Sequence, residues 1–268
     1  MAEMAAPTLL NPRDPNPVRN TPFDTGNSAF VLVGDHAGCA IPAALGDLGL
    51  SAADRARHIA VDLGTRTLGD TLAKRLGAPF VSQVYSRLAI DCNRDPARND
   101  SIVEASDGTL VPGNVGLSGE ARQMRRTEIF DPYHSTIAQL LDERPRAIVI
   151  SLHSFTPVMG STPRPWDVGI LHNGHRDDFA WAMLAELRRA GEIAIGDNAP
   201  YRMDETDYTL PRHAFARQLQ YVELEVRQDH LSNETGVAAM AGILFRTLEN
   251  ARGRITPSSH TNTTAWRT

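Results

Sequence analysis

The chain has 268 residues, of which 41% are hydrophobic and 22% charged, and its formal net charge at pH 7 is −5. This composition excludes global disorder, and the negative charge argues against a nucleic-acid partner, which would usually meet a basic face. No apolar run approaches the roughly 18 residues of a bilayer span, and no secretory signal is evident. The two cysteines, Cys39 and Cys92, form no CxxC pair, which indicates a reducing compartment. We therefore expect a cytoplasmic protein that does not bind membranes.

The two ends of the chain differ in composition from the rest. Residues 1–26 hold five prolines and few large apolar side chains, so we expect an extended N-terminal arm. Strand and helix patterns alternate through residues 27–252 without a repeat or a linker, which predicts a single α/β domain around a mixed sheet. Residues 253–268 are polar and rich in threonine, and we expect a loose C-terminal tail.

Two kinds of periodicity predict the elements of this domain. Short apolar runs predict strands, and apolar residues at helical spacing predict helices. We expect strands over 29–33, 80–84, 88–90, 147–152, 167–171, 193–195 and 221–226. We expect helices from Ser51, over 62–76, from Ser118, and over 132–141, 177–189 and 236–249, with long loops over 99–116 and 196–212. The sequence contains no G-x-G-x-x-G, Walker or G-x-S-x-G motif, so dinucleotide-binding, P-loop and serine-hydrolase functions have no support.

Residues able to do chemistry stand near the ends of three predicted strands. His36 follows the first strand, His153 ends the strand over 147–152, and Glu225 lies near the end of the strand over 221–226. Open α/β sheets bind ligands at the carboxyl ends of their strands. Two histidines, a carboxylate and a water can form a catalytic zinc site, and a further glutamate beside the water makes a hydrolase. This spacing is weak evidence taken alone, because the sequence contains no H-E-x-x-H motif.

Glu223 lies two residues before Glu225, so both side chains point to the same face of their strand. Burying two carboxylates without partners costs several kcal/mol. Arginines, a metal ion or solvent must therefore compensate for them. Glu223 is open to two interpretations, a salt-bridged structural acid or a functional group.

Four segments together resemble the N-formylglutamate amidohydrolase family. They are G-D-H-A-G at 34–38, Y-S-R-L-A-I-D-C-N-R at 85–94, L-H-S at 152–154 and E-L-E-V-R-Q at 223–228, and the resemblance spans roughly 31–231. That family is similar to the zinc carboxypeptidase and aspartoacylase group, which shares the D-x-N-R element. The resemblance implies a three-layer α/β/α hydrolase fold like that of the zinc carboxypeptidases, with a mixed central sheet and one zinc ion per chain.

The resemblance also implies roles for individual residues. His36 and His153 correspond to zinc ligands, and Glu225 corresponds to the catalytic glutamate. Arg87, Asn93 and Arg94 correspond to residues that hold the substrate carboxylate and polarise its carbonyl, and Arg94 is expected to act in catalysis as well. Arg164, on the loop after His153, is a further candidate for carboxylate binding. A guanidinium can form two parallel hydrogen bonds with a carboxylate, which a lysine cannot do.

The chain departs from the carboxypeptidase pattern at the second zinc ligand. That group uses H-x-x-E, but the third residue after His36 is Cys39. Asp62 is our choice for the missing carboxylate, and Asp35 and Cys39 stay open as alternatives. On the loop over 196–213, Tyr208 and His213 could line the pocket, although we favour their interpretation as surface residues.

The function implied is zinc-dependent hydrolysis of a small anionic N-acyl amino acid such as N-formyl-L-glutamate, giving formate and glutamate. One alternative is a related zinc N-acyl amino-acid deacylase or peptidase. Another is a metal-free carboxylate-binding protein on the same fold, which the departure at Cys39 motivates. The sequence leaves the oligomeric state open.

Overall fold

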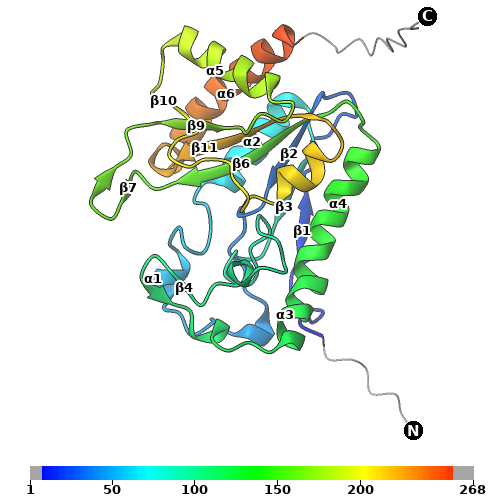
Figure 1. Ribbon diagram of the computed structural model, residues 1–268, viewed down its shortest axis with the longest axis vertical. Helices are drawn as coiled ribbons and strands as arrows, with labels where there is room; N and C mark the ends of the chain where they lie inside the picture. The colour runs from blue at the N-terminus through cyan, green and yellow to red at the C-terminus, as the bar shows by residue number, and fades with distance from the viewer. Residues whose placement is uncertain (1–7, 256–268) are drawn as a thin grey trace, which may run out of the picture.

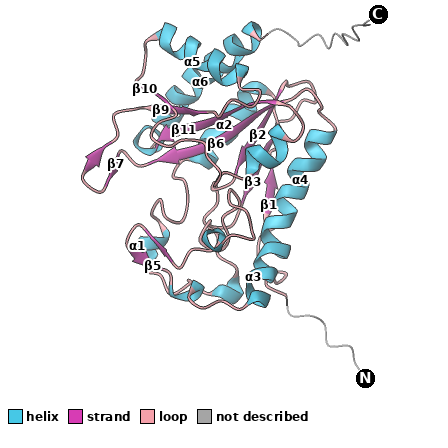
Figure 2. Ribbon diagram, viewed as in Figure 1, coloured by secondary structure: helices cyan, strands magenta, loops and turns pink. Residues whose placement is uncertain are grey.

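A seven-stranded mixed sheet forms the centre of the protein, which is described here over residues 8–255 of a computed structural model (Figures 1 and 2). Its strand order is β1-β3-β2-β6-β11-β9-β10. The strands are β1 (Val18–Asn20), β2 (Phe30–Gly34), β3 (Phe80–Gln83), β6 (Ile148–Phe155), β9 (Val168–Leu171), β10 (Ile195–Asp197) and β11 (Gln220–Arg227). Neighbours among β3, β2, β6 and β11 are parallel, whereas β1 and β9 run antiparallel to β3 and β11.

Helices cover both faces of this sheet (Figure 1). One face carries α2 (Thr65–Leu76), α5 (Asp178–Ala190) and α6 (Glu234–Arg254). The other face carries α4 (Asp131–Asp142), which continues the helical run of α3 (Gly119–Arg125) through the π-helical turn Arg126–Phe130. The predicted three-layer α/β/α fold with a mixed sheet is therefore confirmed.

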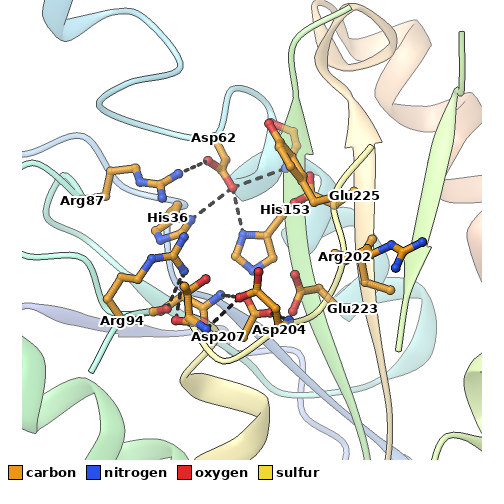
Figure 3. Close-up of a pocket in the computed structure, with 15 residues that line it drawn as sticks. His36, Asp62, Arg87, Arg94, His153, Arg202, Asp204, Asp207, Glu223 and Glu225 are labelled. Atoms are coloured by element: carbon orange, nitrogen blue, oxygen red, sulfur yellow. Dashed lines mark hydrogen bonds and ion pairs between the residues drawn. The ribbon is translucent and has the colours of Figure 1, made fainter. Parts of the chain in front are cut away.

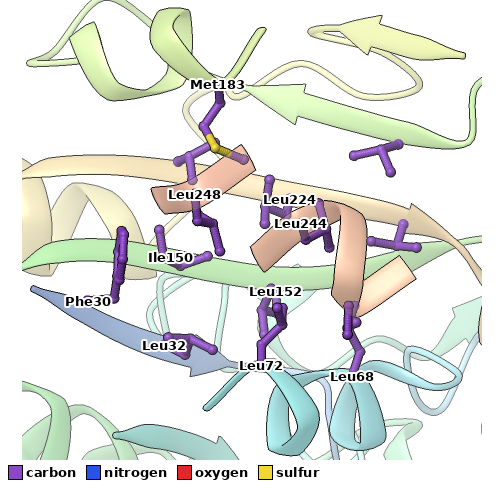
Figure 4. Packing of buried hydrophobic residues seen from close by; sticks show 14 of the residues in the cluster. Phe30, Leu32, Leu68, Leu72, Ile150, Leu152, Met183, Leu224, Leu244 and Leu248 are labelled. Carbon is purple, nitrogen blue, oxygen red and sulfur yellow. The ribbon is translucent and has the colours of Figure 1, made fainter. Parts of the chain in front are cut away.

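The period-two pattern of the strands divides the core into two layers. In β6, Ile148, Ile150 and Leu152 pack beneath α2, α5 and α6 (Figure 4), whereas Val149 faces the α4 side. All eight residues of β6 are buried, as expected for a central strand covered on both faces. The same alternation places His153 on the face of Val149. The site residues of β6 thus lie on the α4 side of the sheet.

The predicted strand over 88–90 is wrong, because this segment forms a tight turn. The Ala89 N–H donates to Ser86 O, and the Ala89 carbonyl accepts from the guanidinium of Arg125, which is 1% exposed. The Ser86 hydroxyl donates to Ala60 O. The first contact closes the turn, and the other two are made with distant parts of the chain. The apolar run therefore has the composition of a strand, but a turn and long-range contacts take the place of strand pairing.

Part of the predicted N-terminal arm belongs to the sheet. β1 pairs with the edge of β3, with Val18 opposite Gln83, and Leu9 is buried with its N–H donating to Glu128. At the other end α6 continues to Arg254, and the rest of the predicted tail lies outside the described residues from position 256 onward. Within residues 8–255, no helix has both the length and the apolar character needed to cross a bilayer.

Candidate active site

Three buried side chains meet beyond the carboxyl ends of β2 and β6. His36 lies on the loop after β2, His153 near the end of β6, and Asp62 on the loop before α2. The Asp62 N–H donates to His36 O at 3.0 Å, which ties the two loops together. Asp62 Oδ2 lies 3.0 Å from His153 Nδ1 and 3.4 Å from His36 Nδ1 (Figure 3). One donor atom from each residue lies within 4.8 Å of the other two, so the three could hold one metal ion.

Each histidine of this cluster also has a partner on its other ring nitrogen. His36 Nε2 lies 2.7 Å from Asp91 Oδ1. His153 Nε2 lies 3.1 Å from Ser151 Oγ and 3.5 Å from Asp35 Oδ2. Carboxylates behind histidines fix the ring orientation in metal sites and make the metal-facing nitrogen a better donor. The two histidines are therefore held with their Nδ1 atoms facing Asp62.

The geometry favours Asp62 over the two alternatives for the carboxylate donor. Asp35 stands behind His153 and accepts a 2.6 Å hydrogen bond from the Thr209 hydroxyl. Cys39 is exposed and does not belong to the cluster. Burial alone would raise the pKa of Asp62, but the neighbouring histidines hold it well below the ordinary value. Asp62 is therefore an ionised carboxylate between two imidazoles.

Glu225 stands beside this cluster on β11, directly opposite His153 in the parallel register. Its Oε2 has no hydrogen-bond partner among the described residues. Burial raises the pKa of Glu225 to about 7, with the charge of Asp62 adding to the effect and His153 opposing it. A carboxyl group that titrates near neutral pH can both take up and release a proton, as general acid–base catalysis requires.

Glu223 is the second buried carboxyl group on β11. It is 3% exposed and forms no ion pair with the residues that the structure describes. Burial raises its pKa well above the ordinary value, which favours the uncharged form. A shift towards the uncharged form, rather than a salt bridge among the described residues, lowers the cost of its burial.

The three-residue cluster and both glutamates line one cavity of about 340 Å³. Arg87, Asn93 and Arg94 line it as well. Arg87 is fixed by Asp91, whose Oδ2 accepts from Nη2 at 2.7 Å and from Nε at 3.1 Å. Arg94 uses Nη1 to bond the carbonyls of Asn93 and Thr206. Two candidate arginines therefore face the same space as the cluster.

The family of the chain follows from a match to a model of N-formylglutamate amidohydrolases over residues 28–232. The chain belongs to the N-formylglutamate amidohydrolase family. The predicted family is thus confirmed, and the chain is an amidohydrolase. The comparison with curated proteins found no significant match.

Two solved structures are similar to this family member. A gene product from Agrobacterium tumefaciens is 32% identical, with 91% of this chain and 98% of that chain covered and a TM-score of 0.87. N-formylglutamate amidohydrolase from Ralstonia eutropha JMP134 is 19% identical, with 89% of this chain and 98% of that chain covered and a TM-score of 0.65. The second likeness shows a shared fold.

Asn93 has a contact pattern that the sequence did not predict. Its Oδ1 accepts from the N–H groups of Tyr208 and Thr209, and its Nδ2 donates to Asp207 Oδ1 at 3.2 Å. Asn93 therefore anchors the loop that closes one side of the cavity. That loop also brings Tyr201, Arg202, Asp204, Thr206 and Asp207 to the cavity wall. Only the length and polarity of the loop could have suggested these residues, because they belong to no recognisable motif.

Arg164 lies outside this cavity. Its Nη1 donates to the Tyr201 hydroxyl at 2.9 Å and to Thr156 Oγ at 3.3 Å, and its guanidinium carbon lies 4.8 Å from the centre of the Tyr201 ring. Arg164 packs against Tyr201, a residue of the cavity wall, so the structure does not support the predicted direct contact between Arg164 and a substrate carboxylate. Arg164 therefore orients a residue of the cavity wall.

Neither Tyr208 nor His213 lines the cavity. The favoured surface interpretation is nevertheless wrong for His213, which is 1% exposed. The π-helical turn Pro211–Phe215 directs its ring inward, where Nε2 lies 2.9 Å from His134 Nδ1. His134 Nε2 in turn lies 3.0 Å from Cys92 O. The pair forms a buried polar contact behind the site.

We expect the His134–His213 pair to make the free energy of unfolding fall as the pH falls. Burial lowers the pKa of His134 to about 4 and that of His213 to about 3, both from 6.5. Between pH 6.5 and 4 the unfolded chain therefore binds protons that the folded chain does not, and the unfolding free energy falls as the pH falls. At pH 4 the expected loss is about 3 kcal/mol per histidine. Urea unfolding between pH 4 and 7.5 should show a weaker pH dependence for a His134→Gln/His213→Gln variant, and equal slopes would contradict the assignment.

Proposed function

We propose that the protein hydrolyses N-formyl-L-glutamate to formate and glutamate with one zinc ion bound by His36, Asp62 and His153. The observation that carries this proposal is the juxtaposition of Glu225, an acid–base group that titrates near pH 7, with a buried cluster of three donor atoms. The family supports amide hydrolysis, and its name supplies the substrate. We also keep the prediction of a cytoplasmic location.

The donor set suits zinc. Two imidazole nitrogens and one carboxylate oxygen are common zinc ligands, and catalytic sites use three protein ligands with a fourth position left open. His36 Nδ1 is buried and has no hydrogen-bond partner among the described residues, as a nitrogen reserved for a metal would be. A zinc ion held there would supply Lewis acidity to the substrate carbonyl and lower the pKa of a water molecule towards about 7.

Glu225 performs the proton transfers in this proposal. Its carboxylate accepts a proton from the attacking water as the new C–O bond forms to the formyl carbon. The protonated group then donates that proton to the amide nitrogen as the C–N bond breaks, which releases formate and the amine of glutamate. Arg87 or Arg94 stabilises the oxyanion, and Arg87 is pre-organised for this role by its bonds to Asp91.

Arg94 binds a substrate carboxylate in the proposal, since it lines the cavity and only its Nη1 has a described hydrogen-bond partner. Arg94→Ala is expected to raise KM for N-formyl-L-glutamate by about 30-fold or more, because truncating one partner of a charge pair costs about 2–5 kcal/mol. Steady-state kinetics measures this change. Arg98→Ala is the matched control, since Arg98 is exposed and pairs with Asp100. An unchanged KM in Arg94→Ala would remove Arg94 from substrate binding.

A substrate panel tests the proposed specificity. Formate release should be fastest with N-formyl-L-glutamate, slower with N-formyl-L-glutamine and slowest with N-formyl-L-leucine, because each step removes a group that arginines or polar atoms recognise. Equal rates across the panel would contradict recognition of an acidic side chain. The metal-free alternative rests on the departure at Cys39, and the proposal assigns the missing carboxylate to Asp62 because it lies beside both histidines.

A further inference from the structure

A second cavity, of about 390 Å³, adjoins the one that holds the three-residue cluster. The two cavities share Arg87, Arg94 and Tyr201 as wall residues. A ligand lying against Arg94 can therefore extend in two directions, towards Glu225 or away from it. The acyl part of an N-formyl amino acid has a single carbon. It therefore has no chain that could extend into the second cavity.

Two hairpins bound this second cavity. One consists of β4 (Ala105–Ser106) and β5 (Thr109–Leu110), and the other of β7 (Val158–Met159) and β8 (Thr162–Pro163). Ser106 and Asp107 line the cavity from the first hairpin, and Met159 lines it from the second. Figure 1 shows the β7 and β4 hairpins projecting on the same side of the molecule, with β7 above β4 in this view. The second cavity therefore lies between the two hairpins.

Each of the three carboxylates of this wall is paired with an arginine. Asp91 accepts from Arg87 at 2.7 Å, Asp100 from Arg98 at 2.9 Å, and Asp107 from Arg57 at 2.8 Å. The remaining contact surface includes apolar side chains, namely Ile59, Leu88, Val103 and Met159. Arg94 is the one arginine of this wall that has no carboxylate partner among the described residues, and a substrate carboxylate would take its free donors. A neutral group can therefore lie against the apolar side chains.

The first cavity is the better place for carboxylates. Arg94 has free donors there, and Arg202 forms no ion pair with the residues that the structure describes. The two carboxylates of a bound N-acyl glutamate would be drawn to these arginines. That arrangement leaves the acyl group to point past Arg87 and Tyr201 into the second cavity.

We infer that the enzyme also hydrolyses N-acyl amino acids whose acyl group is a neutral chain longer than formyl, seated between the two hairpins. This inference rests on the proposed amide hydrolysis and extends its substrate class. The bond that breaks is the same amide C–N bond, and the product is a short-chain carboxylic acid in place of formate. Tyr201, held by Arg164, lines both cavities.

A series of N-acyl-L-glutamates tests the inference on the zinc-loaded wild-type protein. From N-acetyl through N-butanoyl to N-hexanoyl, kcat/KM is expected to rise about three- to fourfold for each added methylene that is buried. N-(4-methylpentanoyl)-glutamate should exceed the N-succinyl compound of similar shape, because the latter carries a charge. A fall of tenfold or more on lengthening the chain, or a preference for N-succinyl, would overturn the inference.

Variants separate this inference from the proposed function. Ser106→Trp should lower the ratio of kcat/KM for N-hexanoyl- over N-formyl-glutamate at least tenfold, because the indole fills the second cavity. Val115→Trp, on an exposed site that lines neither cavity, should leave the ratio unchanged. Hydrolysis of the N-formyl compound alone overturns the inference and keeps the proposed function. Hydrolysis of neither kind of substrate overturns both, and an unchanged ratio in Ser106→Trp overturns the assignment of the cavity.

Discussion

Glu225→Gln is expected to lower kcat for N-formyl-L-glutamate by about 10²–10⁴-fold, the usual contribution of a general acid–base group. The amide has the same shape as the carboxyl group but cannot take up a proton from water. Glu225 is the buried group with a pKa of about 7 that stands opposite His153, so no other described carboxyl group combines this position with this titration range. Steady-state kinetics and zinc analysis of the purified variant measure the effect.

Glu223→Gln provides a control with the same substitution on the same face of the same strand. Burial raises the pKa of Glu223 well above the ordinary value and so favours its uncharged form, which an amide closely resembles. We expect kcat to change less than about tenfold, and zinc content to be unchanged in both variants. Equal losses in the two variants would show that Glu225 has no special role in proton transfer.

Asp62→Asn is expected to weaken zinc binding by more than about 100-fold and to abolish turnover at ambient zinc. The carboxylate lies within 3.4 Å of both imidazole Nδ1 atoms and supplies the only negative charge among the three donors. Loss of a residue behind a metal ligand typically costs 10–100-fold in affinity, so loss of a ligand should cost more. Competition with a chromogenic chelator measures the affinity.

Asp91→Asn is the variant with which the loss of zinc affinity in Asp62→Asn is compared. Asp91 contacts His36 Nε2 at 2.7 Å and holds Arg87, but it does not belong to the cluster. Its replacement should therefore weaken zinc binding by about 10–100-fold. A larger effect at Asp91 than at Asp62 would reverse the assignment of the carboxylate ligand.

Residues on strands could be placed from the sequence because the physical rules for strands are local. The alternation in β6 and β11 fixes which side chains share a face, and the carboxyl ends of parallel strands meet at one edge of a sheet. His36, His153 and Glu225 come together for these reasons. Asp62 lies on a loop, so its choice depended on the family resemblance, and only the structure shows its position between the histidines.

The contacts of loop residues could not be predicted, because they depend on partners that are distant in the chain. Asn93 and Arg164 have the residue types expected for carboxylate binding, yet Asn93 holds the backbone of Tyr208 and Arg164 holds Tyr201. The turn at Ala89 likewise depends on Arg125. No local pattern encodes such pairs.

The most direct test is a titration of metal-free protein with zinc, followed by formate release from N-formyl-L-glutamate. Activity should rise in proportion to added zinc and level off at one equivalent per chain, because His36, Asp62 and His153 form one site. The same titration of Asp62→Asn should give no activity at one equivalent. Full activity of the wild-type protein without metal, or no formate release at any zinc concentration, would contradict the account.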